Sequence, residues 1–203
     1  MPVKITKNRD YRPHSEALNG AHVLLRLAAE QPKGCYYQWM GSLLLSAFAF
    51  EGYMNFLGRI FFPSWGSFER RLSWQLKLTL LGDTIGLAVD PGREPFQTIK
   101  QLFRFRDEVA HPKPCELTET YQATREEAES SLKMYEDVKA EVEIFCCEVN
   151  AKLCIERVEE MMQLLYSRAE TNAQALDPDA KRAFIQNAPW VHSGQSGSSS
   201  LSH

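Results

Sequence analysis

The 203-residue chain lacks the features that mark several common protein classes. It has no Cys-x-x-Cys pair, and five cysteines are an odd number, which argues against both a disulfide framework and a cysteine zinc site. Basic residues are not in excess either, because 23 Lys and Arg face 26 Asp and Glu. We therefore expect a reducing, cytoplasmic location and no general coating of nucleic acid, although this balance still permits a local anion site.

Hydrophobic segments of the membrane type are also missing. The first 14 residues, MPVKITKNRDYRPH, contain no apolar run of the kind that a signal peptide needs. The longest apolar stretch, residues 36–62, has Glu51 near its centre and would be costly in lipid. Its other polar residues recur about every four or five positions: Gln38, Ser42, Ser46, Asn55 and Arg59. We predict a buried helix here and no membrane partner.

Strand-like alternation is nearly absent, whereas apolar residues recur at helical spacing through most of the chain. Prolines and turn residues separate the helical segments. Ser67 is the expected N-cap of a third helix, and Gly82 is expected just past its end. The predicted helices cover residues 15–30, about 36–61, 67–81, about 95–111, and about 124–169, the last as one helix or two nearly collinear ones.

These segments predict an all-α fold, a four-to-five-helix bundle over residues 15–172 that closes with a long amphipathic helix. Residues 1–14 are expected to be an N-terminal extension, with His14 on the surface or in a cap. A short helical segment is predicted over residues 173–190. The Ser- and Gly-rich residues 191–203 are predicted to be a disordered tail.

One segment contains residues that could take part in binding or catalysis. The fourth predicted helix reads REPFQTIKQLFRFRDEVAHPKP, and Arg106 falls in the middle of its apolar stripe. A guanidinium there must pair with an acid, point into a cleft or face a partner chain. Glu51 is the obvious acid, because it is the only one in the second predicted helix. The remaining stripe residues are Phe96, Ile99, Leu102, Phe103, Val109 and Ala110.

A histidine closes the same helix. His111 precedes Pro112, so it should sit at the negative end of the helix dipole, which favours its protonated form. Asp107 lies four residues before it and could bond to its ring. An always-charged anion binder beside a histidine supplies the groups for phosphodiester transfer without a metal.

The spacing within the segment points to a second copy of the chain. Residues five apart on an ideal helix differ by about 140° in direction, so Arg106 and His111 do not naturally share a face. Either the helix loosens before Pro112, or two copies complete the site at a two-fold interface. The second arrangement would also account for an arginine on an apolar face.

The Arg106–His111 hexapeptide followed by proline resembles the R-x4-6-H motif of the HEPN superfamily. The similarity extends over about residues 15–165, because a helix containing SAFAFEGYMNFLG and then SFERRLSWQLKLTLLG precede the motif, as in that family. The resemblance implies a HEPN-type bundle that forms a homodimer with both motifs at the interface. Many members are metal-independent endoribonucleases in toxin–antitoxin or defence systems, whereas others bind nucleotides, RNA or protein without cutting.

Carried onto this chain, the resemblance implies that Arg106 holds the scissile phosphate and that His111 is the general acid and base. Asp107 would orient one of the two. We expect four further residues to bind or orient substrate, namely Glu51, Asn55, Arg104 and Lys113. No metal or cofactor is expected, RNA is the candidate substrate, and an antitoxin or accessory protein is a candidate partner.

Three interpretations therefore stand at the level of sequence. The first is an RNA-cleaving homodimer that yields a 2′,3′-cyclic phosphate. The second is a non-catalytic HEPN-like module that binds a partner protein, nucleotide or RNA, which the acidic net charge favours. The third is a plain helical scaffold in which Arg106 is buried against Glu51 and no cleft lies near His111.

Overall fold

The computed structural model describes residues 11–118, 120, 124–125 and 138–172, and this part of the chain contains helices and loops but no strand. Its α-helices and one 3-10 helix are α1 (Pro13–Glu30), α2 (Cys35–Phe61), α3 (Trp65–Phe68), η1 (Glu69–Arg71), α4 (Trp74–Ile85), α5 (Phe96–Ala110), α7 (Glu141–Phe145) and α8 (Glu148–Asn172). The all-α prediction is confirmed for the described part. No helix in these ranges is long and apolar enough to cross a membrane.

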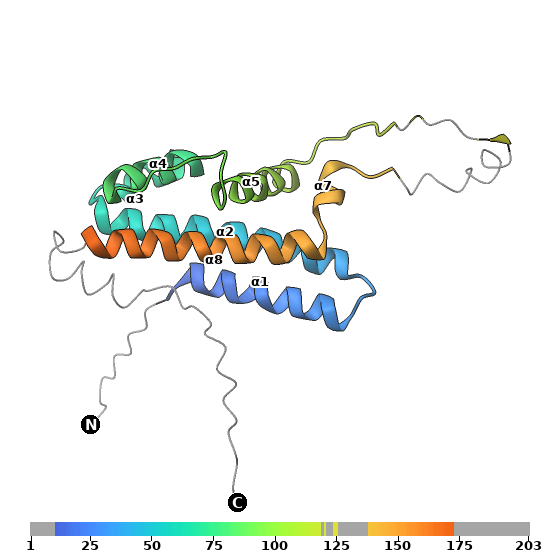
Figure 1. Cartoon of the computed structure of the whole chain (residues 1–203), viewed down its shortest axis with the longest axis horizontal. Helices are drawn as coiled ribbons and strands as arrows, with labels where there is room; N and C mark the ends of the chain where they lie inside the picture. Colours follow the sequence, from blue (N-terminus) through green and yellow to red (C-terminus); the bar gives the residue numbers. More distant parts are fainter. Residues whose placement is uncertain (1–10, 119, 121–123, 126–137, 173–203) are drawn as a thin grey trace, which may run out of the picture.

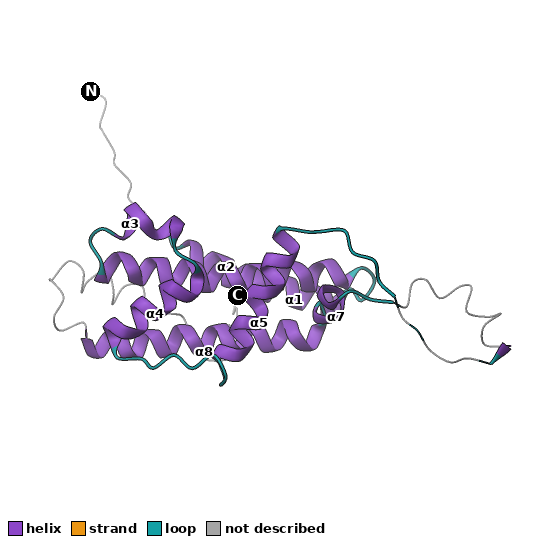
Figure 2. Cartoon of the chain, turned by 90° about the horizontal axis from the view of Figure 1, so that it is seen from above, coloured by secondary structure: helices purple, strands orange, loops and turns teal. Residues whose placement is uncertain are grey.

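The three long helices run side by side and form the body of the bundle (Figure 1). α1 and α2 form a hairpin, and α8 returns along both of them. α4 and α5 follow one another along the opposite face of α2 and α8, so that the two short helices together cover what one long helix would (Figure 2). This arrangement puts Arg106, near the end of α5, beside Glu51 in the middle of α2.

The central helix α2 is buried over most of its length, as the sequence predicted. Its core face, which includes Leu43, Phe50 and Leu57, is fully buried, whereas Phe48 on the other side is half exposed. The two buried serines find partners there: Ser42 Oγ donates to the Ala21 carbonyl at 2.9 Å, and Ser46 Oγ donates to the Ser42 carbonyl at 2.8 Å. Burial of these two serines therefore costs little, because their hydroxyls bond to backbone carbonyls.

The prediction of a single third helix over residues 67–81 was wrong. The chain instead makes the short turns α3 and η1, and a new helix begins after Ser73, whose side chain accepts a hydrogen bond from the Leu76 amide. That helix continues through Gly82 to Gly86, which adopts the left-handed conformation at φ 67°. Gly82 is needed for a close approach instead, since a Cβ there would lie 2.8 Å from the Leu87 carbonyl oxygen.

The long final run is interrupted. The region from 126 to 137 lies outside the described residues, and the following part divides into α7 and α8 at residues 146–147. α7 packs against α5 and turns away from the line of α8 (Figure 1). The buried Cys146 sits at this break, with its thiol 3.5 Å from the Tyr36 carbonyl oxygen. The spacing of apolar residues alone does not predict such a break, because the same spacing resumes after it.

The start of the bundle also differs from the prediction. α1 begins at Pro13, two residues before the predicted start of the first helix at residue 15. His14 is buried at 3% exposure, where it packs against Tyr53 and Phe56 of α2, and the expectation of a surface or cap position was wrong. The predicted short helix over 173–190, the tail over 191–203 and residues 1–10 lie outside the described residues.

Gly58 marks the closest approach between α2 and the turn that follows it. A Cβ at this position would lie 2.1 Å from a ring carbon of Trp65, which is itself fully buried and stacked on Phe62. We expect Gly58→Ala to lower the free energy of unfolding by about 1–3 kcal/mol, because the indole must move out of a packed site. Urea denaturation measures this loss. Gly66→Ala is the matched control, since a Cβ there meets no atom within 4 Å, and equal stability of the two variants would contradict the prediction.

Candidate functional site

The candidate site is built on α5, which ends where the sequence predicted. The backbone amide of His111 makes the last helical bond, to the Asp107 carbonyl at 2.9 Å, and Pro112 has no amide with which to continue. The core face of α5 carries Ile99, Leu102 and Phe103, all fully buried. Packing of this face fixes the direction of the side chains that follow it, from Arg104 to His111.

Arg106 lies between α5 and α2, with its side chain 18% exposed. One terminal nitrogen donates to Glu51 Oε2 at 2.5 Å, which confirms that the acid of the second helix pairs with it. Nε donates to Asp107 Oδ1 at 2.9 Å, and the other terminal nitrogen lies 2.8 Å from the same oxygen. The guanidinium carbon also sits 4.6 Å from the centre of the Phe103 ring. The guanidinium is therefore held by two carboxylates and an aromatic face within one chain.

Lys77 of α4 joins this cluster, and sequence reasoning missed it. Its ammonium donates to the other oxygen of Glu51, Oε1, at 2.8 Å, and its side chain is only 4% exposed. The signal was present in the sequence, because Trp74, Lys77, Leu78 and Leu81 share one helical face. A cation on that apolar stripe is the same anomaly that singled out Arg106.

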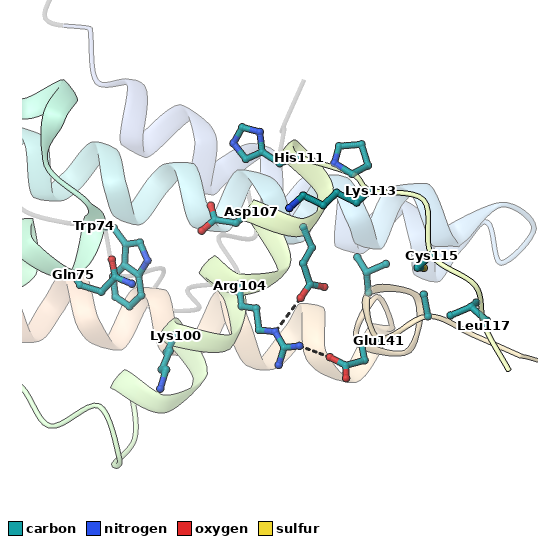
Figure 3. Close-up of a pocket in the computed structure, with 14 residues that line it drawn as sticks. Trp74, Gln75, Lys100, Arg104, Asp107, His111, Lys113, Cys115, Leu117 and Glu141 are labelled. Atoms are coloured by element: carbon teal, nitrogen blue, oxygen red, sulfur yellow. Dashed lines mark hydrogen bonds and ion pairs between the residues drawn. The ribbon is translucent and has the colours of Figure 1, made fainter. Parts of the chain in front are cut away.

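A pocket of about 850 Å³ opens beside the end of α5 (Figure 3). His111 stands at the C-terminal end of the helix and Lys100 lies near its start, with Arg104 between them (Figure 3). The lining residues come from α4, α5, the loop after it and α7: Trp74, Gln75, Lys100, Arg104, Asp107, Glu108, His111, Pro112, Lys113, Cys115, Leu117, Ala140, Glu141 and Val142. A cleft at His111 is what the plain-scaffold interpretation did not expect.

Three of the predicted site residues form one cluster, and His111 stands apart from it in the pocket. Glu51, Arg106 and Asp107 form the ionic cluster described above. Asp107 also lines the pocket together with His111, whereas Arg106 does not line it. The Asp107 carboxylate bonds to the arginine, and His111 is exposed with no side-chain hydrogen bond to any described residue. Within one chain, Asp107 is thus the link between the arginine and the pocket.

The remaining predicted residues differ in their surroundings. Arg104 lines the pocket but is bonded to Glu108 at 2.9 Å and to Glu141 of α7, and the bond to Glu108 is the main reason that its pKa is raised. Lys113 lines the pocket in the loop after α5 and makes no ion pair within the described part of the chain. Asn55 of α2 is half-buried and lies outside the pocket lining, with its side-chain oxygen unpartnered.

The arrangement can bind an anion only if it offers unused donors. A guanidinium has five N–H groups, and the contacts to Glu51 and Asp107 use three of those on Arg106. His111, Lys100 and Lys113 add positive or protonatable groups to the pocket lining. In the described ranges, no three His, Cys, Asp or Glu side chains are grouped in a way that could hold a metal ion.

Comparison with known proteins gives no further guide. No protein-family model, no curated protein and no solved structure matches this chain. Function must therefore be argued from the α5 motif, its ionic cluster and the adjoining pocket.

Proposed function

We propose that this chain is a HEPN-like protein that acts as a homodimer and cleaves RNA without a metal ion. The observation that carries the proposal is that the histidine end of the R-x4-H motif lines a pocket, while the arginine is bonded to a residue of that pocket. His111 and Asp107 line that pocket of about 850 Å³, and Asp107 is bonded to Arg106 at 2.9 Å. An exposed imidazole and a held guanidinium are the pair that acid–base transfer at a phosphodiester requires, and Asp107 is the residue that bonds to the guanidinium and lines the pocket of the imidazole.

In the proposed reaction, His111 removes the proton from a ribose 2′-hydroxyl. The 2′-oxygen then attacks the adjacent phosphorus and the bond to the 5′-oxygen breaks. The leaving oxygen takes up a proton from the imidazolium of His111, and the products are a 2′,3′-cyclic phosphate and a 5′-hydroxyl. Arg106 would stabilise the charge that develops on the non-bridging oxygens.

The dimer is part of the proposal because one chain offers its two motif groups in different directions. Arg106 is bonded to Glu51 on α2 and does not line the pocket, whereas His111 does. Two motifs related by a two-fold axis would bring the arginine of one copy near the histidine of the other. Size-exclusion chromatography with light scattering should then give twice the 23.2 kDa of a single chain.

We expect RNA cleavage by the wild type in EDTA and a loss of about 100-fold or more in both Arg106→Ala and His111→Ala, because each removes a group needed in the transition state. Mass spectrometry of the products should show 2′,3′-cyclic phosphate ends. Arg70→Ala removes an exposed arginine far along the chain from the motif and should leave cleavage unchanged. Equal activity in the wild type and both motif variants would remove the catalytic proposal.

A second candidate is a non-catalytic HEPN-like module that binds a partner protein, nucleotide or RNA through the same pocket. The observation that favours it is the neutralisation of the arginines near the motif. Arg104 is paired with Glu108 and Glu141, and Arg106 with Glu51 and Asp107. Growth arrest on overexpression that His111→Ala relieves is expected of the ribonuclease but not of this binding module.

A further inference from the structure

Lys77 is an unusual residue for the position that it occupies. It lies on the face of α4 that packs into the core, with Trp74, Leu78 and Leu81 on the same face. Its side chain is 4% exposed, and a buried ammonium is costly unless it is fully partnered. Substitution by an apolar residue would fill this space without that cost, so the charge itself needs an explanation.

The explanation lies in how Lys77 divides the oxygens of Glu51. The ammonium takes Oε1 at 2.8 Å, and Arg106 takes Oε2 at 2.5 Å. A guanidinium beside a lone carboxylate prefers a fork in which two N–H groups meet both oxygens. With Oε1 already occupied, Arg106 makes only one bond to Glu51. Its Nε and remaining terminal nitrogen are then left for Asp107, at 2.9 and 2.8 Å.

The other groups that face Lys77 and Arg106 agree with this division of roles. The charges of Lys77, Arg106, Glu51 and Asp107 sum to zero, so none of them is left uncompensated. Lys77 also contributes to the lowered pKa of Glu69, although hydrogen bonding to Arg59 is the main cause of that shift. From α4, Trp74 stacks on Phe103 at 4.4 Å, and Phe103 in turn supports the guanidinium of Arg106.

We propose that Lys77 is a positioning residue for Arg106. By occupying one oxygen of Glu51, it directs the guanidinium toward Asp107, and thus toward the pocket that Asp107 and His111 line. The role of Arg106 in the reaction rests on the proposed function, but its placement by Lys77 can be tested without any activity.

The test is nitrogen-15 NMR of the arginine side chains in the full chain. The Arg106 Nε signal is identified by its disappearance in Arg106→Lys, and Asp107→Ala gives the signal of an Arg106 that lacks the Asp107 bond. We expect Lys77→Met to move the Arg106 signal toward the Asp107→Ala position, because the guanidinium turns to form the fork with Glu51. Lys77→Arg keeps a donor at Oε1 and should preserve the wild-type signal. Lys152→Met is the control, since Lys152 pairs with Glu148 at an exposed site on α8.

A second variant covers the case in which Lys77→Met does not fold. Lys77→Gln keeps an amide NH₂ donor without the charge, so the Arg106 signal should stay at the wild-type position. An unchanged signal in a folded Lys77→Met, or a signal at the Asp107→Ala position in Lys77→Gln, would overturn the proposal.

Cleavage measurements separate this inference from the proposed function. If RNA is cut, Lys77→Met should reduce kcat/KM by up to about 100-fold, and Lys77→Arg should restore most of it, because a small displacement of Arg106 misaligns the charge that it offers. If no variant or wild type cuts RNA but the Arg106 signal moves as expected, the catalytic proposal fails and the positioning role stands. If RNA is cut and the signal does not move, the positioning role fails alone.

Discussion

Replacing Glu51 with alanine is expected to lower the free energy of unfolding by about 3–5 kcal/mol, the usual cost of removing one partner from a buried ion pair. The carboxylate is the only described acid within salt-bridge distance of Lys77, whose side chain is 4% exposed. Without Glu51 the ammonium would be buried and unpaired. Arg106 would lose one bond as well but would keep those to Asp107. Urea denaturation of the variant and the wild type at neutral pH measures the difference.

Two further variants make the Glu51 result specific. Glu108→Ala removes an acid whose partner Arg104 is 67% exposed, and its stability should change by no more than about 1 kcal/mol. Adding Lys77→Met to Glu51→Ala should recover part of the lost stability, because the stranded charge is removed. A loss below about 1 kcal/mol in Glu51→Ala would mean that Lys77 reaches water or another partner in solution.

Acidification is expected to destabilise the protein through His14. Burial, aided by the nearby charge of Arg12, lowers the pKa of this imidazole to about 4. An exposed histidine in the unfolded chain titrates near 6.5, so between these values the unfolded state binds more protons than the folded state. The stability that the neutral His14 side chain gives to the folded state is fully present above about pH 6.5 and is lost as the pH falls to about 4. The full loss corresponds to about 3 kcal/mol.

The measurement compares urea denaturation at several pH values between 7 and 4 for the wild type and His14→Phe. A phenyl ring can take up the contacts with Tyr53 and Phe56 without titrating. The wild type should lose about 3 kcal/mol more than the variant over this range. Carboxylates titrate in both proteins, so their effect cancels in the difference. Parallel curves for the two proteins would show that the folded state accommodates a charged His14.

The ends of several elements could be predicted from the sequence because proline fixes them locally. α2 stops before Pro63 and α5 before Pro112, since neither proline has an amide to continue the helix. The break before Ser73 was missed because residues 67–81 keep an apolar spacing that also fits one continuous helix. Which serine caps a helix is decided by the packing of the turn around Trp65, and a pattern along the chain does not contain that information.

The ionic cluster shows the same division between local and tertiary information. The pairing of Arg106 with Glu51 was predictable, because an arginine on an apolar stripe needs an acid and α2 carries only one. The bond from Asp107 to Arg106 instead of His111 was not, since neighbours along the chain meet only when a third group restricts them. The pocket depends on α7 and the loop after α5 meeting across the helix end, a contact that no periodicity encodes.

The position of α8 has a consequence for how the chain matures during synthesis. The bond between His22 and Glu159 closes a span of 137 residues, and α8 packs against α1, α2, α4 and α5. During synthesis, α1 and α2 therefore leave the ribosome long before α8, which packs against both of them. Such long-range closure slows folding, and the apolar faces that α8 covers stay exposed until α8 (Glu148–Asn172) has left the ribosome.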